Sequence, residues 1–199
     1  MSLDWNIDSS WSLFLDRDGV INERPINDYV LEWEKFHFRP DVLSSFSSLC
    51  AKFSHVFVVT NQQCVALNKI SESDLENIHS QMQKEISKNG GFITKVFAAT
   101  ELKNKFSKMR KPNTMMAQMA KKEFPSVDFK KSIMVGDTDS DIIFGKKLGM
   151  KTVLILTSEK TSIKPDISLN CFGIAVVLFG IAIILFVIEV QMSARALEY

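Results

Sequence analysis

Short apolar runs alternate along the chain with longer segments in which apolar residues recur at helical spacing. The runs are rich in β-branched and aromatic residues, a composition typical of buried strands. We expect five strands, at about residues 11–15, 55–59, 95–99, 132–135 and 152–156. Because helical segments separate these runs, the sequence predicts an α/β fold with a doubly wound, Rossmann-like parallel sheet.

Local signals mark where several helices begin. Ser73 and Glu76 have the spacing of a capping box after the second predicted strand. Pro40 opens an earlier helix, and either Asp139 or Ser140 is expected to cap the helix after the fourth strand. These helices would cover both faces of the sheet and leave the carboxyl ends of its strands open.

The composition indicates one domain of ordinary size with a short appendage. The chain has 199 residues, and its 24 Lys and Arg nearly balance its 23 Asp and Glu. This balance gives no reason to favour a nucleic-acid partner. The three cysteines, Cys50, Cys64 and Cys171, lack C-x-x-C spacing, and no secretory signal precedes the first strand. Both features indicate a reducing, cytoplasmic location.

Polar residues follow the predicted strands at their carboxyl ends, the edge at which open α/β sheets bind ligands. Four separate segments supply them, so the sequence predicts a single composite site. The residues at these positions are Asp16 and Asp18, Thr60 and Asn61, Lys111, and Asp137 with Asp141.

Two carboxylates two residues apart on a glycine-ended turn suit phosphoryl transfer. Asp16 is the candidate nucleophile, and Asp18 the acid that protonates the leaving alkoxide and then activates water. Gly19 lets the backbone turn away, so that both side chains face one cavity and a main-chain carbonyl stays free for a metal. Mg²⁺ is the expected cation, held by Asp16, Asp18 and Asp137, because the paired anions would otherwise repel the phosphate.

The remaining candidates have both a functional and an ordinary interpretation. The Thr60 hydroxyl and the Lys111 ammonium could bind phosphate oxygens. Alternatively, Thr60 and Asn61 could cap a helix, and Lys111 could be a solvated lysine. Asp141, one helical turn beyond Asp137, could orient Lys111 or a water bound to the metal.

Four short motifs occur in order as Asp16-Arg17-Asp18-Gly19, Val59-Thr60, Lys111-Pro112 and Gly136-Asp137 through Asp141. Over about residues 10–170 the sequence thereby resembles the haloacid dehalogenase superfamily. The resemblance implies a phosphorylated Asp16, Asp18 as acid and base, and Asp137 as a Mg²⁺ ligand. It also implies that Thr60 and Lys111 bind phosphate. Residues 16–22, 60–62 and 110–112 further resemble the branch that contains heptose 1,7-bisphosphate and histidinol-phosphate phosphatases.

The sequence departs from that branch ahead of the motif lysine. The branch commonly carries a Cys/His zinc loop there, whereas residues 97–109 contain neither Cys nor His, so zinc is not supported. The short spacing between motifs leaves no room for a large cap domain. Substrate recognition is therefore assigned to loops such as 23–34 and 100–110, with Arg110 as a candidate ligand for a second phosphate or a carboxylate.

The chain changes character near its end. Residues 171–188 form an apolar run of 18 residues, which is close to the lower limit for a membrane span. We expect a phosphatase domain over residues 1–170 and an apolar tail over 171–199. Several interpretations of the tail stay open: a C-terminal membrane anchor, a helix packed on the sheet, a self-associating surface, or a foreign or frame-shifted end.

Together these features predict a Mg²⁺-dependent phosphomonoesterase that acts on a small sugar phosphate through an aspartyl-phosphate. D-glycero-D-manno-heptose 1,7-bisphosphate is the favoured substrate, and histidinol phosphate and nucleic-acid 3′-phosphates are the alternatives. The near-neutral charge disfavours the nucleic acid. A membrane-tethered phosphate-binding protein without turnover is the non-enzymatic alternative. The two intact aspartates of the first motif disfavour it.

Overall fold

A computed structural model describes residues 5–25 and 28–172. One six-stranded sheet, in which all pairs are parallel, has the order β3-β2-β1-β4-β5-β6. This confirms the predicted α/β sheet and adds one short edge strand that the sequence analysis did not include. The strands are β1 (Ser12–Leu15), β2 (His55–Asn61), β3 (Lys95–Ala99), β4 (Ser132–Gly136), β5 (Lys151–Ile155) and β6 (Ile167–Leu169).

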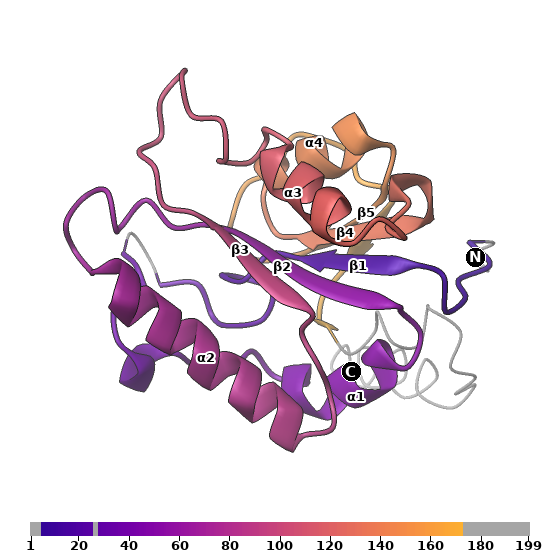
Figure 1. Cartoon of the computed structure of the whole chain (residues 1–199), viewed down its shortest axis with the longest axis horizontal. Helices are drawn as coiled ribbons and strands as arrows, with labels where there is room; N and C mark the ends of the chain where they lie inside the picture. The colour runs from indigo at the N-terminus through magenta and orange to yellow at the C-terminus, as the bar shows by residue number, and fades with distance from the viewer. Residues whose placement is uncertain (1–4, 26–27, 173–199) are drawn as a thin grey trace, which may run out of the picture.

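Helices cover both faces of the sheet (Figure 1). Helices α1 (Val42–Cys50) and α2 (Glu72–Lys88) lie on one face, and α3 (Met115–Glu123) and α4 (Asp139–Leu148) on the other. Single 3-10 turns span Trp33–Lys35 and Phe129–Lys131. Alternate residues of β1 enter the two cores, Leu13 and Leu15 on the α1 and α2 side and Phe14 on the other.

Two predicted helix caps are wrong by a few residues. Ser71, not Ser73, is the N-cap of α2, and its Oγ accepts a hydrogen bond from the Asp74 backbone N–H (3.1 Å). Thr138, rather than Asp139 or Ser140, is the N-cap of α4. The Thr138 backbone N–H donates to Asp141 Oδ2 (3.1 Å), which is the return bond of a capping box.

The strand order reverses between β1 and β4, so the site predicted at the strand ends falls at the topological switch point of the sheet. Leu15 pairs with Val135 in the register of β1 and β4, and the Asp16 backbone N–H donates to the Val135 carbonyl (2.9 Å). Asp16 and Asp137 therefore emerge side by side from the centre of the sheet.

Most of the predicted apolar tail lies outside the described residues, since only 171 and 172 of it are included. Phe172 is buried, and its ring stacks on Phe46 of α1 with centroids 5.9 Å apart. Across residues 5–25 and 28–172, every helix is too short or too polar to cross a membrane. Those residues also contain no inserted cap domain, as predicted.

Candidate active site

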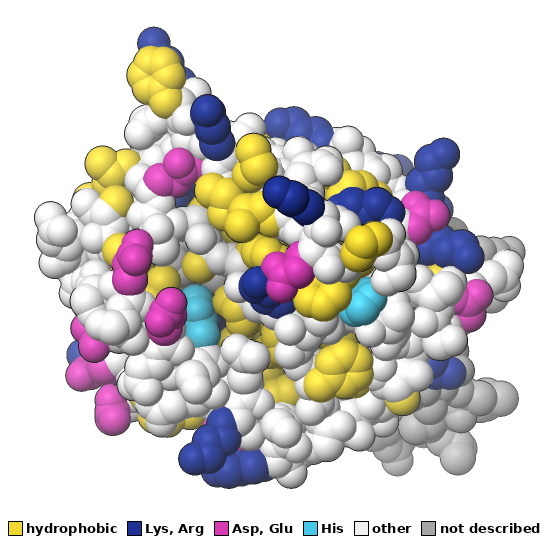
Figure 2. All heavy atoms as spheres, viewed as in Figure 1, with side chains coloured by type: hydrophobic (Ala, Val, Ile, Leu, Met, Phe, Trp, Pro, Cys, Tyr) yellow, Lys and Arg dark blue, Asp and Glu magenta, His cyan; other side chains and the backbone are white. Residues whose placement is uncertain are grey.

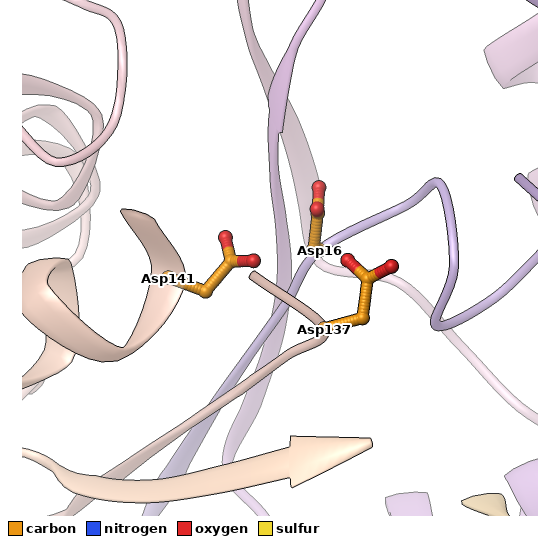
Figure 3. Close-up of side chains that lie close together, drawn as sticks. All are labelled: Asp16, Asp137 and Asp141. Atoms are coloured by element: carbon orange, nitrogen blue, oxygen red, sulfur yellow. The ribbon is translucent and has the colours of Figure 1, made fainter. Parts of the chain in front are cut away.

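A buried chain of charges lies at the carboxyl ends of β1 and β4. Lys111 Nζ is 2.9 Å from Asp16 Oδ1 and 2.6 Å from Asp141 Oδ1. All three side chains are almost fully buried. Figure 3 shows that Asp16, Asp137 and Asp141 point toward one another from the residue after β1, the residue after β4 and the first turn of α4. The ammonium group thus bridges the candidate nucleophile and the first turn of a helix.

The position of Lys111 is fixed from two sides. Asp141 Oδ2 accepts from the Thr138 hydroxyl (2.6 Å), so this carboxylate caps α4 with one oxygen and orients Lys111 with the other. The Asn61 amide pairs with the Lys111 backbone, accepting from its N–H (2.9 Å) and donating to its carbonyl (3.3 Å). This contact lets Asn61 fix the Lys111 backbone, while Asn61 also lines the pocket.

The pKa of the Asp16 carboxyl lies near neutral pH. Burial raises the pKa of its carboxyl to about 7, with Asp141 and Asp137 acting in the same direction and Lys111 and Arg24 opposing them. A further positive charge at the site would favour the ionised form, which is the form that can attack phosphorus.

Asp18 has a different environment. Arg17 donates to both Asp18 carboxylate oxygens (2.9 and 3.0 Å), and the side-chain amides of Asn22 (2.9 Å) and Gln62 (2.7 Å) donate as well. Burial alone would raise the pKa of Asp18, but Arg17 and these hydrogen bonds outweigh it and lower the pKa. The ionised carboxylate suits the predicted base step, whereas the predicted acid step needs an added proton.

Arg17 is positioned by His79, a residue that was not predicted from the sequence. Arg17 is fully buried, and its Nη1 lies 3.1 Å from His79 Nε2 in α2. Since a guanidinium can only donate, Nε2 accepts and the ring proton is on Nδ1. Burial and the charge of Arg17 lower the pKa of His79 to about 3, so the ring is neutral. The available signal was a histidine on the apolar stripe of α2, next to Ile78.

Three oxygens converge on the guanidinium of Arg24, which the sequence analysis also missed. Arg24 Nη2 donates to Asp137 Oδ1 (2.7 Å) and to the Asp18 carbonyl (2.8 Å), and lies 3.6 Å from Asp16 Oδ2. Arg24 Nε adds a hydrogen bond to Asp137 Oδ2 (3.0 Å). Burial would lower the pKa of Arg24, but Asp137 outweighs this effect and raises it.

The same oxygens form a donor set that fits a hard divalent cation. Carboxylate atoms of Asp16, Asp137 and Asp141 lie within 4.8 Å of one another. Asp141 is bonded to the buried Lys111 and to the Thr138 hydroxyl at the start of α4, whereas the partner of the Asp18 carbonyl is Arg24, which is 32% exposed. The Asp18 carbonyl is therefore the better third ligand. Gly19, with φ of +89°, leaves the needed space, because a Cβ there would collide with the Asp137 carboxylate.

A pocket of about 720 Å³ opens above these groups. Asp16, Asp18, Arg24, Asn61, Arg110 and Lys111 are part of its wall. Thr60 is fully buried, and its hydroxyl accepts from Gln62 Nε2 (2.8 Å). Thr60 is not one of the residues that line the pocket in the described part of the chain, so it lies beneath the pocket surface, next to Asn61.

Comparisons with known proteins agree with this architecture. A family model described as HAD-hydrolase-like matches residues 108–166. The chain is 33% identical over 132 residues to a D-glycero-alpha-D-manno-heptose-1,7-bisphosphate 7-phosphatase of Mycobacterium bovis, covering 66% of this chain and 70% of that one. An enzyme of the same name from Campylobacter jejuni is 34% identical over 149 residues, covering 75% and 84%. The chain belongs to the haloacid dehalogenase-like phosphatases.

A solved structure has a fold similar to that of this phosphatase. A D,D-heptose 1,7-bisphosphate phosphatase from B. bronchiseptica, complexed with magnesium and phosphate, matches with a TM-score of 0.75. The match covers 83% of this chain and 96% of that chain at 21% identity, so it concerns the fold. The resemblance stated from the motifs is thereby confirmed, and the chain is an enzyme that hydrolyses phosphate monoesters.

In this phosphatase the loop before Lys111 is closed by a carboxylate. Glu101 Oε1 accepts from the backbone N–H groups of Met109 (2.7 Å) and Arg110 (3.1 Å). Arg110 lines the pocket, and its Nη1 is buried with no hydrogen-bond partner among the described residues. Glu101 thus holds the backbone of a side chain that has an unused donor.

Proposed function

We propose that this protein is a Mg²⁺-dependent phosphomonoesterase that forms an aspartyl-phosphate on Asp16. The proposed substrate is a small sugar bisphosphate, D-glycero-D-manno-heptose 1,7-bisphosphate. The observation that carries the proposal is the buried contact of Asp16 with Lys111 at the floor of an open pocket. A nucleophile and a fixed positive charge within 2.9 Å are what attack on an anionic phosphate requires.

In the first half-reaction an Asp16 carboxylate oxygen attacks phosphorus, and the bond from phosphorus to the sugar oxygen breaks. Lys111 neutralises charge on the non-bridging oxygens. The Asp18 carboxylate faces the incoming phosphate, whose negative charge favours the protonated acid. That proton passes to the leaving alkoxide, and Asp18 then removes a proton from the water that hydrolyses the aspartyl-phosphate.

We assign the cation site to Asp16, Asp137 and the Asp18 carbonyl. Mg²⁺ prefers oxygen ligands and shares its coordination with phosphate, and when bound it supplies charge neutralisation between phosphate and the carboxylates. The converging oxygens around Arg24 and the space left by Gly19 support this assignment.

Two observations support a substrate with a second anionic group. Relatives that share about a third of their residues with this chain are named heptose 1,7-bisphosphate 7-phosphatases. In addition, Arg110 has a buried guanidinium nitrogen without a hydrogen-bond partner in the part of the chain that the structure describes, and Lys103 lies in the same pocket wall. The second phosphate of a bisphosphate would satisfy both groups.

The test is phosphate release from a panel containing heptose 1,7-bisphosphate, histidinol phosphate and a 3′-phosphorylated oligonucleotide, with Mg²⁺ present. We expect the highest kcat/KM on the bisphosphate, and a loss of at least about 10³-fold in Asp16→Asn, because its nucleophile is removed. Asp41→Asn is the matched control, since Asp41 is exposed, lies outside the pocket wall and has a left-handed backbone that Asn tolerates. Retained turnover in Asp16→Asn, or preference for another substrate, would contradict the proposal.

We also propose a cytoplasmic location. Cys50 and Cys64 are free thiols, and burial raises the pKa of both. Buried, protonated thiols without a disulfide partner support a reducing compartment.

A further inference from the structure

The proposed catalytic scheme gives no role to Arg24, although Arg24 contacts the groups at its centre. Its guanidinium hydrogen-bonds to Asp137 and to the Asp18 carbonyl, and it lies 3.6 Å from Asp16. These are the three groups assigned above to Mg²⁺. Arg24 Nη2 lies within 3.6 Å of an oxygen of each group, so it occupies the place that an ion bound by all three would need.

The contacts of Arg24 differ from those of an ordinary surface ion pair. Asp16 and Asp137 are buried at 6% and 1% exposure, and two such carboxylates repel each other unless a positive charge lies between them. Arg24 supplies that charge through its fork on Asp137, at 2.7 and 3.0 Å. The carboxylates are thereby held with their oxygens toward one point.

The Arg24 side chain also has room to leave. It is 32% exposed and forms part of the pocket wall, whereas Lys111 is 1% exposed and is held at both ends. Rotation about its side-chain bonds would move the guanidinium from the carboxylates into the pocket, where an anionic substrate would attract it.

We infer that Arg24 is a tethered cation that competes with Mg²⁺ for Asp16, Asp137 and the Asp18 carbonyl. Binding of the metal is then an exchange in which three oxygens pass from the guanidinium to the ion. The exchange weakens the affinity for Mg²⁺ and keeps the acidic groups paired at low metal concentration. This inference rests on the proposed Mg²⁺ site and adds a residue that sets its affinity.

The experiment is calorimetric titration of the full chain with MgCl₂ at about pH 8, where the Asp16 carboxyl is ionised. Arg24→Gln removes the charge, and we expect its Kd for Mg²⁺ to fall by about tenfold, since a hydrogen bond to a charged group no longer has to be broken. Arg24→Lys keeps the charge without the fork and is expected to bind Mg²⁺ about threefold more tightly than the parent.

Two control variants accompany this titration. Arg110→Gln removes the same charge from the same pocket without a described contact to the three oxygens, so its Kd for Mg²⁺ should stay within about twofold of the parent value. Asp137→Asn should abolish binding. As a second readout, Arg24→Gln without Mg²⁺ should unfold at a lower temperature than the parent, and saturating Mg²⁺ should remove this difference.

The outcomes separate this inference from the proposed function. Unchanged or weaker Mg²⁺ binding in both Arg24 variants overturns the exchange while the Mg²⁺ site stands. An equal gain in Arg110→Gln also overturns it, because the effect is then general electrostatics. Absence of binding in the parent and in every variant overturns both the exchange and the proposed metal site.

Discussion

The floor and the rim of the pocket are built in opposite ways. The floor consists of Asp16, Lys111, Asp137 and Asp141, and none of these residues is more than 6% exposed. The rim is the loop 100–110, in which Phe106 is 77% exposed. Figure 2 shows the tip of this loop projecting from the surface, with hydrophobic and basic side chains together. Ion pairs of Lys111 with Asp16 and Asp141 hold the floor together. The rim is held by hydrogen bonds from its own backbone N–H groups to the Glu101 carboxylate.

This difference explains where chemistry and specificity separate in the molecule. A buried charge that loses its partner is costly, so each floor residue depends on the others. A loop closed by hydrogen bonds from backbone amides accepts many side chains without loss of shape. We therefore propose that the floor fixes the reaction type and that the rim adapts to the substrate.

Among substitutions at the pocket, the largest effect is expected from breaking the floor. Lys111→Gln leaves Asp16 and Asp141 facing each other without a positive charge between them. We expect the free energy of unfolding to fall by about 3 kcal/mol, measured by urea denaturation, together with loss of turnover. Lys95→Gln is the matched control, because it breaks an exposed pair with Glu123 (2.6 Å) and should cost less than about 1 kcal/mol. Equal losses in the two variants would remove the distinction between floor and surface.

The next effect is expected at His79, which accepts a hydrogen bond from Arg17, the partner of Asp18. Above pH 6.5 His79 is neutral in both folded and unfolded chains, but between pH 6.5 and about 3 only the unfolded chain takes up the proton. Stability therefore falls as the pH falls through this window. At about 1.4 kcal/mol per pH unit, the loss from this group between pH 6.5 and about pH 5 is about 2 kcal/mol.

His79→Gln tests this loss, because glutamine keeps an acceptor for Arg17 but does not titrate. Urea denaturation at several pH values should give a flatter dependence of stability on pH than in the parent chain. His55→Gln is the control, since His55 is only partly buried and its ring contacts the Ser126 hydroxyl. An unchanged slope in His79→Gln would mean that His79 is not the buried neutral histidine described above.

The floor was also the part that the sequence could predict. A strand that is a continuous apolar run identifies its own end, so Asp16 and Asp137 could be assigned to one edge of the sheet from local pattern alone. The contact of Asp141 with Lys111 was one of the two roles expected for Asp141, and it is present. These predictions needed only strand ends and the helical repeat, both of which are written in neighbouring residues.

Residues whose partners are distant in sequence could not be predicted. Arg24 contacts Asp137 across 113 positions and His79 contacts Arg17 across 62, and no periodicity relates them. The cap of α2 was predicted wrongly for another reason: Ser71 with Asp74 and Ser73 with Glu76 have the same spacing, and spacing alone does not distinguish the two pairs. Strand β6 has three residues at an edge, too few to show alternation.

A smaller effect is expected from loosening the rim. Glu101→Ala frees the backbone of Met109 and Arg110 and leaves the floor contacts intact. We expect kcat/KM to fall by about tenfold, mainly through KM, because Arg110 loses its fixed position. Glu101→Gln should recover most of the loss, since its Oε1 still accepts. Glu123→Ala, on an exposed face of α3, is the control for removing a carboxylate. A fall in kcat alone would place Glu101 with the floor.

The smallest effect is expected at the tip of the rim. The Phe106 ring is 77% exposed. The Lys105 ammonium lies over it, 5.1 Å from the ring centroid. Phe106→Ala therefore removes little buried surface, and the free energy of unfolding should change by less than about 0.5 kcal/mol in urea denaturation. The same substitution at Phe57, which is fully buried in β2, should cost about 3 to 5 kcal/mol. If Phe106→Ala destabilised the chain by more than about 1 kcal/mol, the rim would be packed against the domain. The rim would then not tolerate different side chains, and the contrast with the floor would be lost.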